Sequence, residues 1–321
     1  MKKLLIKTIL VSIVVLLLPF LLTLAFSKQS STTTGSFKAE NFNIYYEVNG
    51  TKTDLSFDEY LLGVIAANIP ASYQMETLKA QAVIARTYAL YNISTLSKEN
   101  SGQTDFSTSE LGLSYIGLDA LKDLWDDENY TYYFSKLENA VYATDNEVIV
   151  YDNDLILPVF FDTGSGFTRN ASEAWGVDIP YLTSVASKQD VTSTNYLSIK
   201  EYATNDLIDL LGKYYTDLDI TVDNFFDEVN ISLRDSSGYV LKINLGDLTI
   251  SGEEFAKVLG LSSNHFYIEE YGDHVRIVCN GDGHGVGLSQ YGANVMAEDG
   301  SSYEDILEYY YTGVTFARLS S

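Results

Sequence analysis

The chain has 321 residues, of which 46% are hydrophobic and 20% are charged. This composition supplies enough apolar side chains for a large core and excludes an intrinsically disordered chain. With 44 acidic and 20 basic residues, the formal net charge is -24, so a nucleic-acid backbone would be repelled and we expect no nucleic-acid partner.

The N-terminal segment predicts a membrane anchor. Three lysines precede a run from Thr8 to Phe26 that contains no charged residue, which is long enough to cross a hydrocarbon core of about 20 helical residues. The cationic end should stay in the cytoplasm, and a cleaved signal peptide is the alternative. We expect a single-pass cell-membrane protein with a cytoplasmic tip and transmembrane anchor over residues 1–28, a flexible linker over 29–39 and an extracytoplasmic domain over 40–321.

The extracytoplasmic part opens with a predicted β-hairpin. The segment FNIYYEV alternates in character and is followed by Asn49-Gly50, a strong signal for a tight hairpin turn. Ser56 and Glu59 then have the spacing of a capping box, in which each residue bonds the backbone of the other. We therefore expect a strand pair followed by a short helix over about residues 57–67.

A proline separates this helix from the next one. Pro70 disfavours helical backbone in the residue before it, so the first helix should end there. Good helix formers with one apolar face follow from after Ser72 to about Asn92. Residues 93–139 are acidic and polar, and we expect loops around short helices there. The N-terminal unit is thus helix, Asn-Ile-Pro loop, helix.

The remaining segments mix strands and helices without regular alternation between them. We expect two strands over residues 147–161 with a turn at 152–154, the loop DTGSGFTR, an amphipathic helix over 199–214, a three-stranded meander over 229–250, a short helix over Glu253–Leu259, a hairpin over 265–279 and a closing helix over Ser302–Tyr311. Such a mixture of helices and antiparallel hairpins is typical of an α+β fold.

Cysteine and histidine are too scarce for a disulfide framework or a zinc finger. Cys279 is the only cysteine, so no intramolecular disulfide can form, and its alternating strand pattern predicts a small buried hydrophobe. His265, His274 and His284 do not have zinc-finger spacing. We expect neither a bound metal nor a cofactor, so the core must stabilise the domain.

The run GDGHGVGLSQYGA has the most unusual local composition in the chain. Glycines alternate from Gly281 to Gly287 and leave bare backbone around His284, so a ligand or another segment can approach closely. The run lacks the Gly-Lys-Ser/Thr ending of a phosphate loop. Two interpretations stay open: a tight turn in which His284 is packed or solvated, and a site in which it donates hydrogen bonds or protons.

Two segments together resemble one protein family. The stretches YLLGVIAANIP, METLKAQAVIARTYAL and GHGVGLSQYGANVMAEDGSSYEDILEYYYTGV are similar to the paired signatures of the stage II sporulation protein D (SpoIID) family, which shares its domain with the amidase enhancer LytB. FFDTGSGFTRNASEAWG resembles the family's Ser/Gly loop followed by a tryptophan. The likeness covers about residues 40–318. It implies a SpoIID-type domain that acts on peptidoglycan in sporulation, in the engulfment stage, as a lytic transglycosylase of glycan strands stripped of stem peptides.

The resemblance also implies one catalytic acid and shows that it is absent. The family's general acid is a Glu directly before Met-Pro in the loop between the two N-terminal helices; this position is Asn68 here. The acid protonates the glycosidic oxygen and, as a carboxylate, then takes the proton of the sugar's 6-hydroxyl. An amide can bond a sugar but cannot carry that proton. We expect a pseudoenzyme with weakened or lost catalysis; the alternative is an active enzyme that uses Glu59 or Glu76.

Other matched residues are candidates for binding the glycan. They are His284, Gln290, Arg86, Ser165 and Tyr88. For Arg86, as for Lys79 and Gln81 on the same matched helix, the alternative is that the side chain satisfies neighbouring backbone and loop groups. Tyr88 and Tyr291 either stack on sugars or pack in the core. Where family members usually have a histidine and a Ser-Gly-Gly run, this chain has Phe161 and Gly-Ser-Gly at 164–166.

The resemblance implies partners as well as a substrate. The expected partners are peptidoglycan glycan strands, a cell-wall amidase and other sporulation membrane proteins. A different class of function also stays open, in which the chain is a non-catalytic scaffold that activates or localises a partner amidase.

Overall fold

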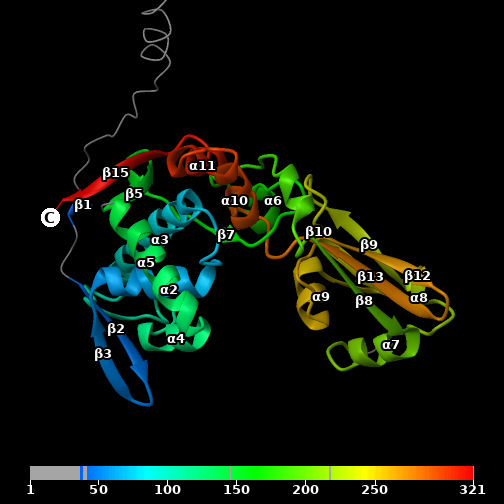
Figure 1. Ribbon diagram of the computed structural model, residues 1–321. Helices are drawn as coiled ribbons and strands as arrows, with labels where there is room; N and C mark the ends of the chain where they lie inside the picture. Colours follow the sequence, from blue (N-terminus) through cyan, green and yellow to red (C-terminus); the bar gives the residue numbers. More distant parts are fainter. Residues whose placement is uncertain (1–36, 39–41, 145, 217, 321) are drawn as a thin grey trace, which may run out of the picture. The chain divides into compact units, whose positions relative to one another are not determined.

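The computed structural model describes residues 37–38, 42–144, 146–216 and 218–320 (Figure 1). The predicted anchor and most of the predicted linker lie outside these residues. Among the helices that the structure describes, none is both long enough and apolar enough to cross a membrane. The described residues combine helices with antiparallel sheets, which confirms the α+β class.

Along the chain, which Figure 1 colours from blue to red, helices and strands are interspersed. The α-helices are α2 (Phe57–Asn68), α3 (Met75–Glu99), α4 (Leu121–Leu124), α5 (Asp127–Ala143), α6 (Ala171–Trp175), α7 (Thr204–Gly212), α8 (Phe225–Glu228), α9 (Gly252–Leu259), α10 (Gln290–Glu298) and α11 (Tyr303–Tyr310). The strands are β1 (Phe37–Lys38), β2 (Asn43–Val48), β3 (Thr51–Leu55), β4 (Asp105–Ser107), β5 (Glu147–Tyr151), β6 (Asp154–Leu155), β7 (Phe160–Phe161), β8 (Leu197–Ala203), β9 (Val229–Arg234), β10 (Val240–Leu245), β11 (Leu248–Ser251), β12 (Phe266–Tyr271), β13 (His274–Asn280), β14 (Leu288–Ser289) and β15 (Thr315–Ser320).

The predicted N-terminal hairpin and capping box are both present. Strands β2 and β3 pair antiparallel, and Asn49 and Gly50 in their turn have φ of 51° and 78°, the left-handed conformation that a two-residue hairpin needs. The Ser56 hydroxyl accepts from the Glu59 backbone N–H while the Glu59 carboxylate accepts from the Ser56 N–H. Helix α2 therefore begins where the sequence predicts.

The first core packs α2 and α3 against a helix that the sequence did not predict. Helix α3 extends beyond Asn92 to Glu99, and α5 occupies 17 residues where only short helices in loops were expected. Leu137, Ala140 and Val141 are the buried residues of α5 and join the core of α2 and α3. Of the aromatic residues of α5, Tyr130, Tyr133 and Phe134 are half-buried, whereas Tyr132 and Tyr142 are exposed. The composition of the helix is polar, so its apolar face was too narrow to recognise.

A second core lies between α3, α11 and the sheet of β5 and β15. Strand β5 is buried along four of its five residues and pairs antiparallel with β15. The Ile149 N–H of β5 donates to the Thr87 hydroxyl of α3 at 3.0 Å. The sheet also contains β1, so it holds strands from both ends of the described chain, and it is bonded to α3, the helix of the first family signature.

Residues 197–280 form a third core of two three-stranded sheets and the helices α7 and α9. The meander β9 to β11, helix α9 and the hairpin of β12 and β13 confirm the predictions for this part. Cys279 is buried in β13, with 1% of its surface exposed, as predicted. The helix predicted over 199–214 is wrong in its first part, because residues Leu197–Ala203 form β8, which pairs along its whole length with β13. Only Thr204–Gly212 are helical.

Candidate functional site

The alternating glycines allow the run from 281 to 287 to lie directly against the segment that contains β7. All four have positive φ, between +79° and +108°. A Cβ added at Gly287 would lie 2.0 Å from the Val159 carbonyl oxygen, and one at Gly283 would lie 2.6 Å from the Phe161 Cβ. Only glycine fits both the backbone conformation and these approaches. The run thus brings β14 into parallel pairing with β7 and places the start of α10.

His284 is held within this run by bonds to its own neighbourhood. Its Nδ1 accepts from the Val286 N–H at 3.1 Å, and the ring also hydrogen-bonds the Phe160 backbone. The rings of Phe161 and Trp175 pack on it at centroid distances of 5.7 and 5.9 Å. Burial lowers the pKa of His284 to about 4, so the ring is neutral near pH 7. These contacts favour the interpretation in which His284 is a packed side chain over the one in which it carries protons.

Asn68 is the last residue of α2 and fastens that helix to a distant loop. Its side-chain Nδ2 donates to the Val64 carbonyl at 2.6 Å and to the Ser114 carbonyl at 2.8 Å. Only the NH₂ half of the amide can donate to two carbonyl oxygens, so these partners fix its orientation. The Asn68 side chain therefore donates two structural hydrogen bonds that a carboxylate in the same place could not donate.

The two signatures of the chain meet at Asn68. Gln290, the first residue of α10, donates through Nε2 to the Asn68 backbone carbonyl at 2.8 Å and to the Gln81 Oε1 atom at 3.1 Å. On the next turn, the Asn294 Oδ1 atom accepts from the Gln74 N–H at 2.7 Å. The structure thus brings together Asn68 and Gln290, two predicted site residues that are 222 positions apart in the sequence.

An open hollow of about 410 Å³ adjoins Asn68. Its lining comes from the end of α2, the loop after it, and α4 with the following residue: Ala66, Ala67, Asn68, Ile69, Pro70, Ala71, Leu124 and Trp125. No charged side chain lines this hollow, although the chain as a whole is strongly acidic. Within the part of the chain that the structure describes, no cluster of three His, Cys, Asp or Glu side chains could hold a metal ion.

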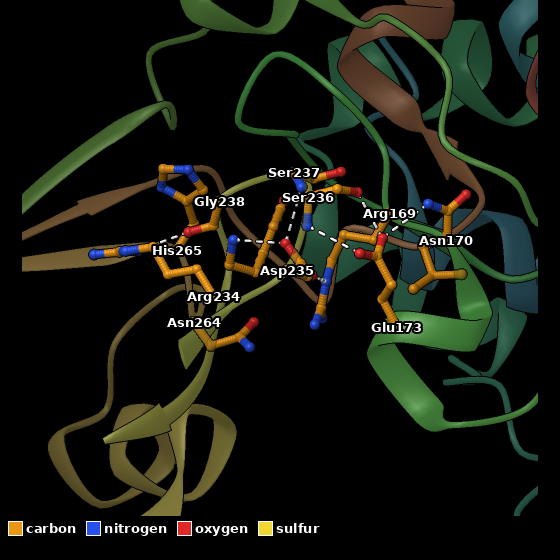
Figure 2. A network of polar contacts seen from close by, with 12 residues as sticks. Arg169, Asn170, Glu173, Arg234, Asp235, Ser236, Ser237, Gly238, Asn264 and His265 are labelled. Atoms are coloured by element: carbon orange, nitrogen blue, oxygen red, sulfur yellow. Dashed lines mark hydrogen bonds and ion pairs between the residues drawn. The ribbon is translucent and has the colours of Figure 1, made fainter. Parts of the chain in front are cut away.

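A buried ion pair joins the Ser/Gly loop to the β9–β10 hairpin. Figure 2 shows Arg169, from the loop before α6, directed at Asp235; the Nε–Oδ2 distance is 2.6 Å, and the two side chains are 5% and 0% exposed. Arg169 also donates to the His284 carbonyl at 3.0 Å. Beside it, the Ser236 hydroxyl donates to Glu173 of α6 at 2.6 Å. These contacts position the Ser/Gly loop and the glycine run together.

Comparison with known proteins identifies the family. A model described as stage II sporulation protein matches residues 46–151. Stage II sporulation protein D of Bacillus subtilis (strain 168) is 32% identical over 271 residues, which cover 84% of this chain and 77% of the relative. The chain belongs to the stage II sporulation protein D family. The protein of the same name from Bacillus amyloliquefaciens is 33% identical over 280 residues, with 87% and 79% covered. These matches confirm the resemblance found in the sequence.

A more distant relative of this SpoIID-family chain carries a different name. The amidase enhancer of Bacillus subtilis (strain 168) is 26% identical over 303 residues, which cover 79% of this chain but 40% of the relative. The family resemblance makes Asn68 the position of interest. The catalytic and binding roles assigned to individual side chains from the sequence stay predictions.

The two carboxylates considered as replacement acids both make structural bonds. Glu59 closes the capping box at the other end of α2, roughly 14 Å from Asn68 at 1.5 Å per residue. Hydrogen bonds from Ser56 lower the pKa of Glu59. Glu76 pairs with Lys79 at 2.7 Å and accepts from the Tyr303 N–H at 3.0 Å. For Glu59, these bonds favour the ionised form and oppose a role as proton donor.

The other predicted binding residues are held in separate places. Arg86 is 2% exposed and donates to the Val141 and Glu147 carbonyls and to the Thr144 hydroxyl. These bonds fit the alternative in which its side chain satisfies neighbouring backbone and loop groups. Tyr88 is half-buried on α3, and its hydroxyl lies 3.3 Å from a Cβ built on Gly112. Ser165 lies in the Ser/Gly loop beside Tyr239, whose pKa burial raises to about 12.

Asp190 is a buried acid of this SpoIID-family domain that sequence reasoning missed. Its Oδ2 atom accepts from the Gly164 N–H at 2.8 Å, and its Oδ1 atom accepts from the Ser289 hydroxyl at 2.9 Å. Ser289 in turn caps the N-terminus of α10. Asp190 therefore ties the Ser/Gly loop to the helix that carries Gln290. No local pattern marked it, because Gly164 and Ser289 are distant from it in the sequence.

Asp190 should make the stability of the domain fall between pH 4 and 6. Burial raises its pKa from 3.8 to about 6, so the folded state favours the protonated acid. Its contribution is fully present below pH 3.8 and is lost as the pH rises through 6, by roughly 3 kcal/mol. Urea unfolding of the wild type and Asp190→Asn at each pH would measure this. If the difference between the two proteins does not change with pH, the interpretation is wrong.

Proposed function

We propose that this chain binds peptidoglycan glycan strands stripped of their stem peptides during sporulation, and that its lytic transglycosylase activity is weakened or lost. The observation that carries this proposal is Asn68, an amide at the family's acid position whose two N–H groups are bound by the Val64 and Ser114 carbonyls. The proposal includes the membrane anchor predicted over Thr8–Phe26, with the domain outside the cell membrane.

The chemistry of strand cleavage explains why one substitution matters. The glycosidic oxygen must receive a proton as its bond to the anomeric carbon breaks, and the sugar's 6-hydroxyl must give up a proton as its oxygen attacks that carbon. One carboxyl group performs both transfers in turn. Asn68 can perform neither, and loss of a general acid typically lowers the rate by about 10²–10⁴.

The framework around Asn68 supports binding without cleavage. Gln290 and Gln81 hold the end of α2 against the glycine-rich segment, and the hollow beside Asn68 is uncharged and open. The uncharged, hydrogen-bonding N-acetylglucosamine units of a glycan strand suit such a surface better than a charged ligand does. The amidase enhancer relative favours a second candidate, in which the chain activates or localises a cell-wall amidase without cutting glycan itself.

The purified full-length chain should bind amidase-treated peptidoglycan and release almost no 1,6-anhydro-muropeptides from it. Co-sedimentation measures binding, and chromatography of the soluble fraction measures cleavage. Peptidoglycan that keeps its stem peptides is the matched control and should bind less, because the peptides add bulk along the strand.

Two results would contradict the proposal. Absence of binding to the stripped strands would remove the glycan function and favour the amidase candidate, for which capture of an amidase from detergent-solubilised sporulating cells is the direct assay. Rapid release of 1,6-anhydro products by the wild type, abolished by Glu76→Gln or Glu59→Gln in a folded protein, would establish an active enzyme that uses another acid.

A further inference from the structure

A buried histidine lies between two aromatic rings, each of which carries an arginine. The His265 ring meets the Tyr239 ring edge-on at a centroid distance of 5.2 Å and the Tyr267 ring at 5.6 Å. The Arg169 guanidinium lies 4.6 Å from the Tyr239 ring centroid, and the Arg234 guanidinium lies 4.6 Å from that of Tyr267. We call these five side chains the His265 stack; Figure 2 shows its histidine and both arginines. The stack joins the Ser/Gly loop to the β9–β10 hairpin and β12.

The surroundings of His265 suit a neutral ring. Only 6% of the residue is exposed, and a Cβ added at Gly238 would lie 2.7 Å from its Nε2 atom. No side chain that the structure describes bonds its Nδ1 atom. A protonated imidazole carries a hydrogen on both nitrogens and needs two acceptors. Protonation in place would therefore leave a buried N–H without a side-chain acceptor, which is costly.

The charged groups that face His265 also oppose a proton on it. Arg169 approaches from the Ser/Gly loop and Arg234 from β9, while the facing residue of β12 is the neutral Tyr267. The anion that faces the ring is Asp235, whose Oδ2 atom is already paired with Arg169 at 2.6 Å. Burial first, and then the two arginines, lower the pKa of His265 below its ordinary value, although a bond to its own backbone and Asp235 act in the opposite direction.

The residues around the ring also hold the contact between the hairpin and the Ser/Gly loop. Asp235 Oδ1 accepts from the Ser237 and Tyr239 N–H groups, and the Ser237 hydroxyl donates to the Thr168 carbonyl at 2.8 Å. Arg234 donates to the Gly238 carbonyl in the same turn at 2.6 Å. Because His265 packs directly on Tyr239 and Gly238, a displaced ring would disturb this turn.

We propose that His265 is a pH-sensitive latch: the neutral ring holds the β9–β10 hairpin against the Ser/Gly loop, and the protonated ring leaves the stack and releases that contact. This inference concerns the stability of the loop and does not depend on the proposed glycan binding. The latch is closed at full strength above pH 6.5, the ordinary pKa of histidine, and weakens as the pH falls below it. One proton weakens it by up to about tenfold for each pH unit.

Hydrogen exchange of the full-length chain between pH 7.5 and 5.5 tests the latch. Peptides that cover residues 164–176 and 234–240 should exchange up to about tenfold faster at pH 5.5, after correction for the intrinsic pH dependence of exchange. Peptides from the buried part of α3 should show no such change. His265→Phe keeps an aromatic ring without a proton to gain, so the pH effect on the two segments should disappear.

A second histidine supplies the matched control. His274 pairs with Asp273 at the surface, and its side chain is 42% exposed, so His274→Phe should keep the wild-type pH effect. Asp190 and His284 also titrate, but both are present in every variant and cancel in the comparison. His265→Gln gives the same comparison if His265→Phe does not fold. The latch is refuted if the wild type and the His265 variant respond equally to pH, or if α3 opens together with the two segments.

Discussion

Asn68→Glu should release 1,6-anhydro-muropeptides from amidase-treated peptidoglycan about 10²–10⁴ times faster than the wild type, whereas Asn68→Gln should not. Glutamate restores the one group that both proton transfers need, and glutamine has the same length and shape without an exchangeable acid. The pair therefore separates proton chemistry from side-chain size. The measurement is the initial rate of product release at matched protein concentrations.

The geometry of Asn68 also predicts where the new carboxyl would lie. The wild-type amide donates to the Val64 and Ser114 carbonyls, and a carboxylate facing those two oxygens would be repelled. The longer Glu side chain should therefore turn away from them, toward the hollow that position 68 lines. Loss of the two bonds should lower the free energy of unfolding by about 1–3 kcal/mol, in Asn68→Gln less than in Asn68→Glu, because glutamine keeps an NH₂ donor.

Equal rates for Asn68→Glu and Asn68→Gln would show that an acid at this position is not sufficient. The Ser/Gly loop would then be the expected cause of the missing activity, because Phe161 stands where family members usually have a histidine, and its ring packs on His284. A gain by Asn68→Glu that disappears in Trp125→Ala would instead connect the hollow to catalysis.

The sequence predicted the elements whose signals are local. The Ser56–Glu59 capping box, the Asn49-Gly50 turn and the hairpin of β12 and β13 depend on residues that are neighbours in the chain, and all are present. The meeting of Asn68 with Gln290 has no local signal, and no periodicity or spacing predicted it. It follows from the glycine run, whose positive φ angles and close backbone approaches place α10 against the end of α2.

The elements that the sequence missed depend on long-range partners. Leu197–Ala203 form a strand because β13 supplies a partner for each of these residues, and tertiary pairing overrides the helical pattern that seemed to begin at residue 199. Asp190 and Asp235 are single acids in unremarkable segments, and only the fold shows that each is buried and bonded to a distant loop. Burial of a charge is a property of the assembled core, so composition alone could not reveal it.

Arg169→Ala should lower the free energy of unfolding by about 3–5 kcal/mol, because it leaves the buried Asp235 carboxylate without its cation. Asp235 Oδ1 is already used, since it accepts from the Ser237 and Tyr239 N–H groups at 3.1 and 2.9 Å. The Oδ2 atom is the one that forms the ion pair with Arg169. Urea unfolding followed by circular dichroism measures the change.

The control for this variant is an ion pair of similar chemistry at the surface. Arg276 pairs with Glu201 at 2.9 Å, with both side chains accessible to water, so Arg276→Ala should change stability by no more than about 1 kcal/mol. Arg169→Met combined with Asp235→Leu should be less destabilising than Arg169→Ala alone, because the double variant buries no unpaired charge. If Arg169→Ala costs no more than Arg276→Ala, the buried pair does not hold the Ser/Gly loop to the β9–β10 hairpin. A large loss of stability in Arg169→Ala that is absent from the double variant would show that the loss comes from the unpaired buried carboxylate of Asp235. Glycan binding by the double variant would then show whether the Ser/Gly loop needs the ion pair itself or only the packing around it.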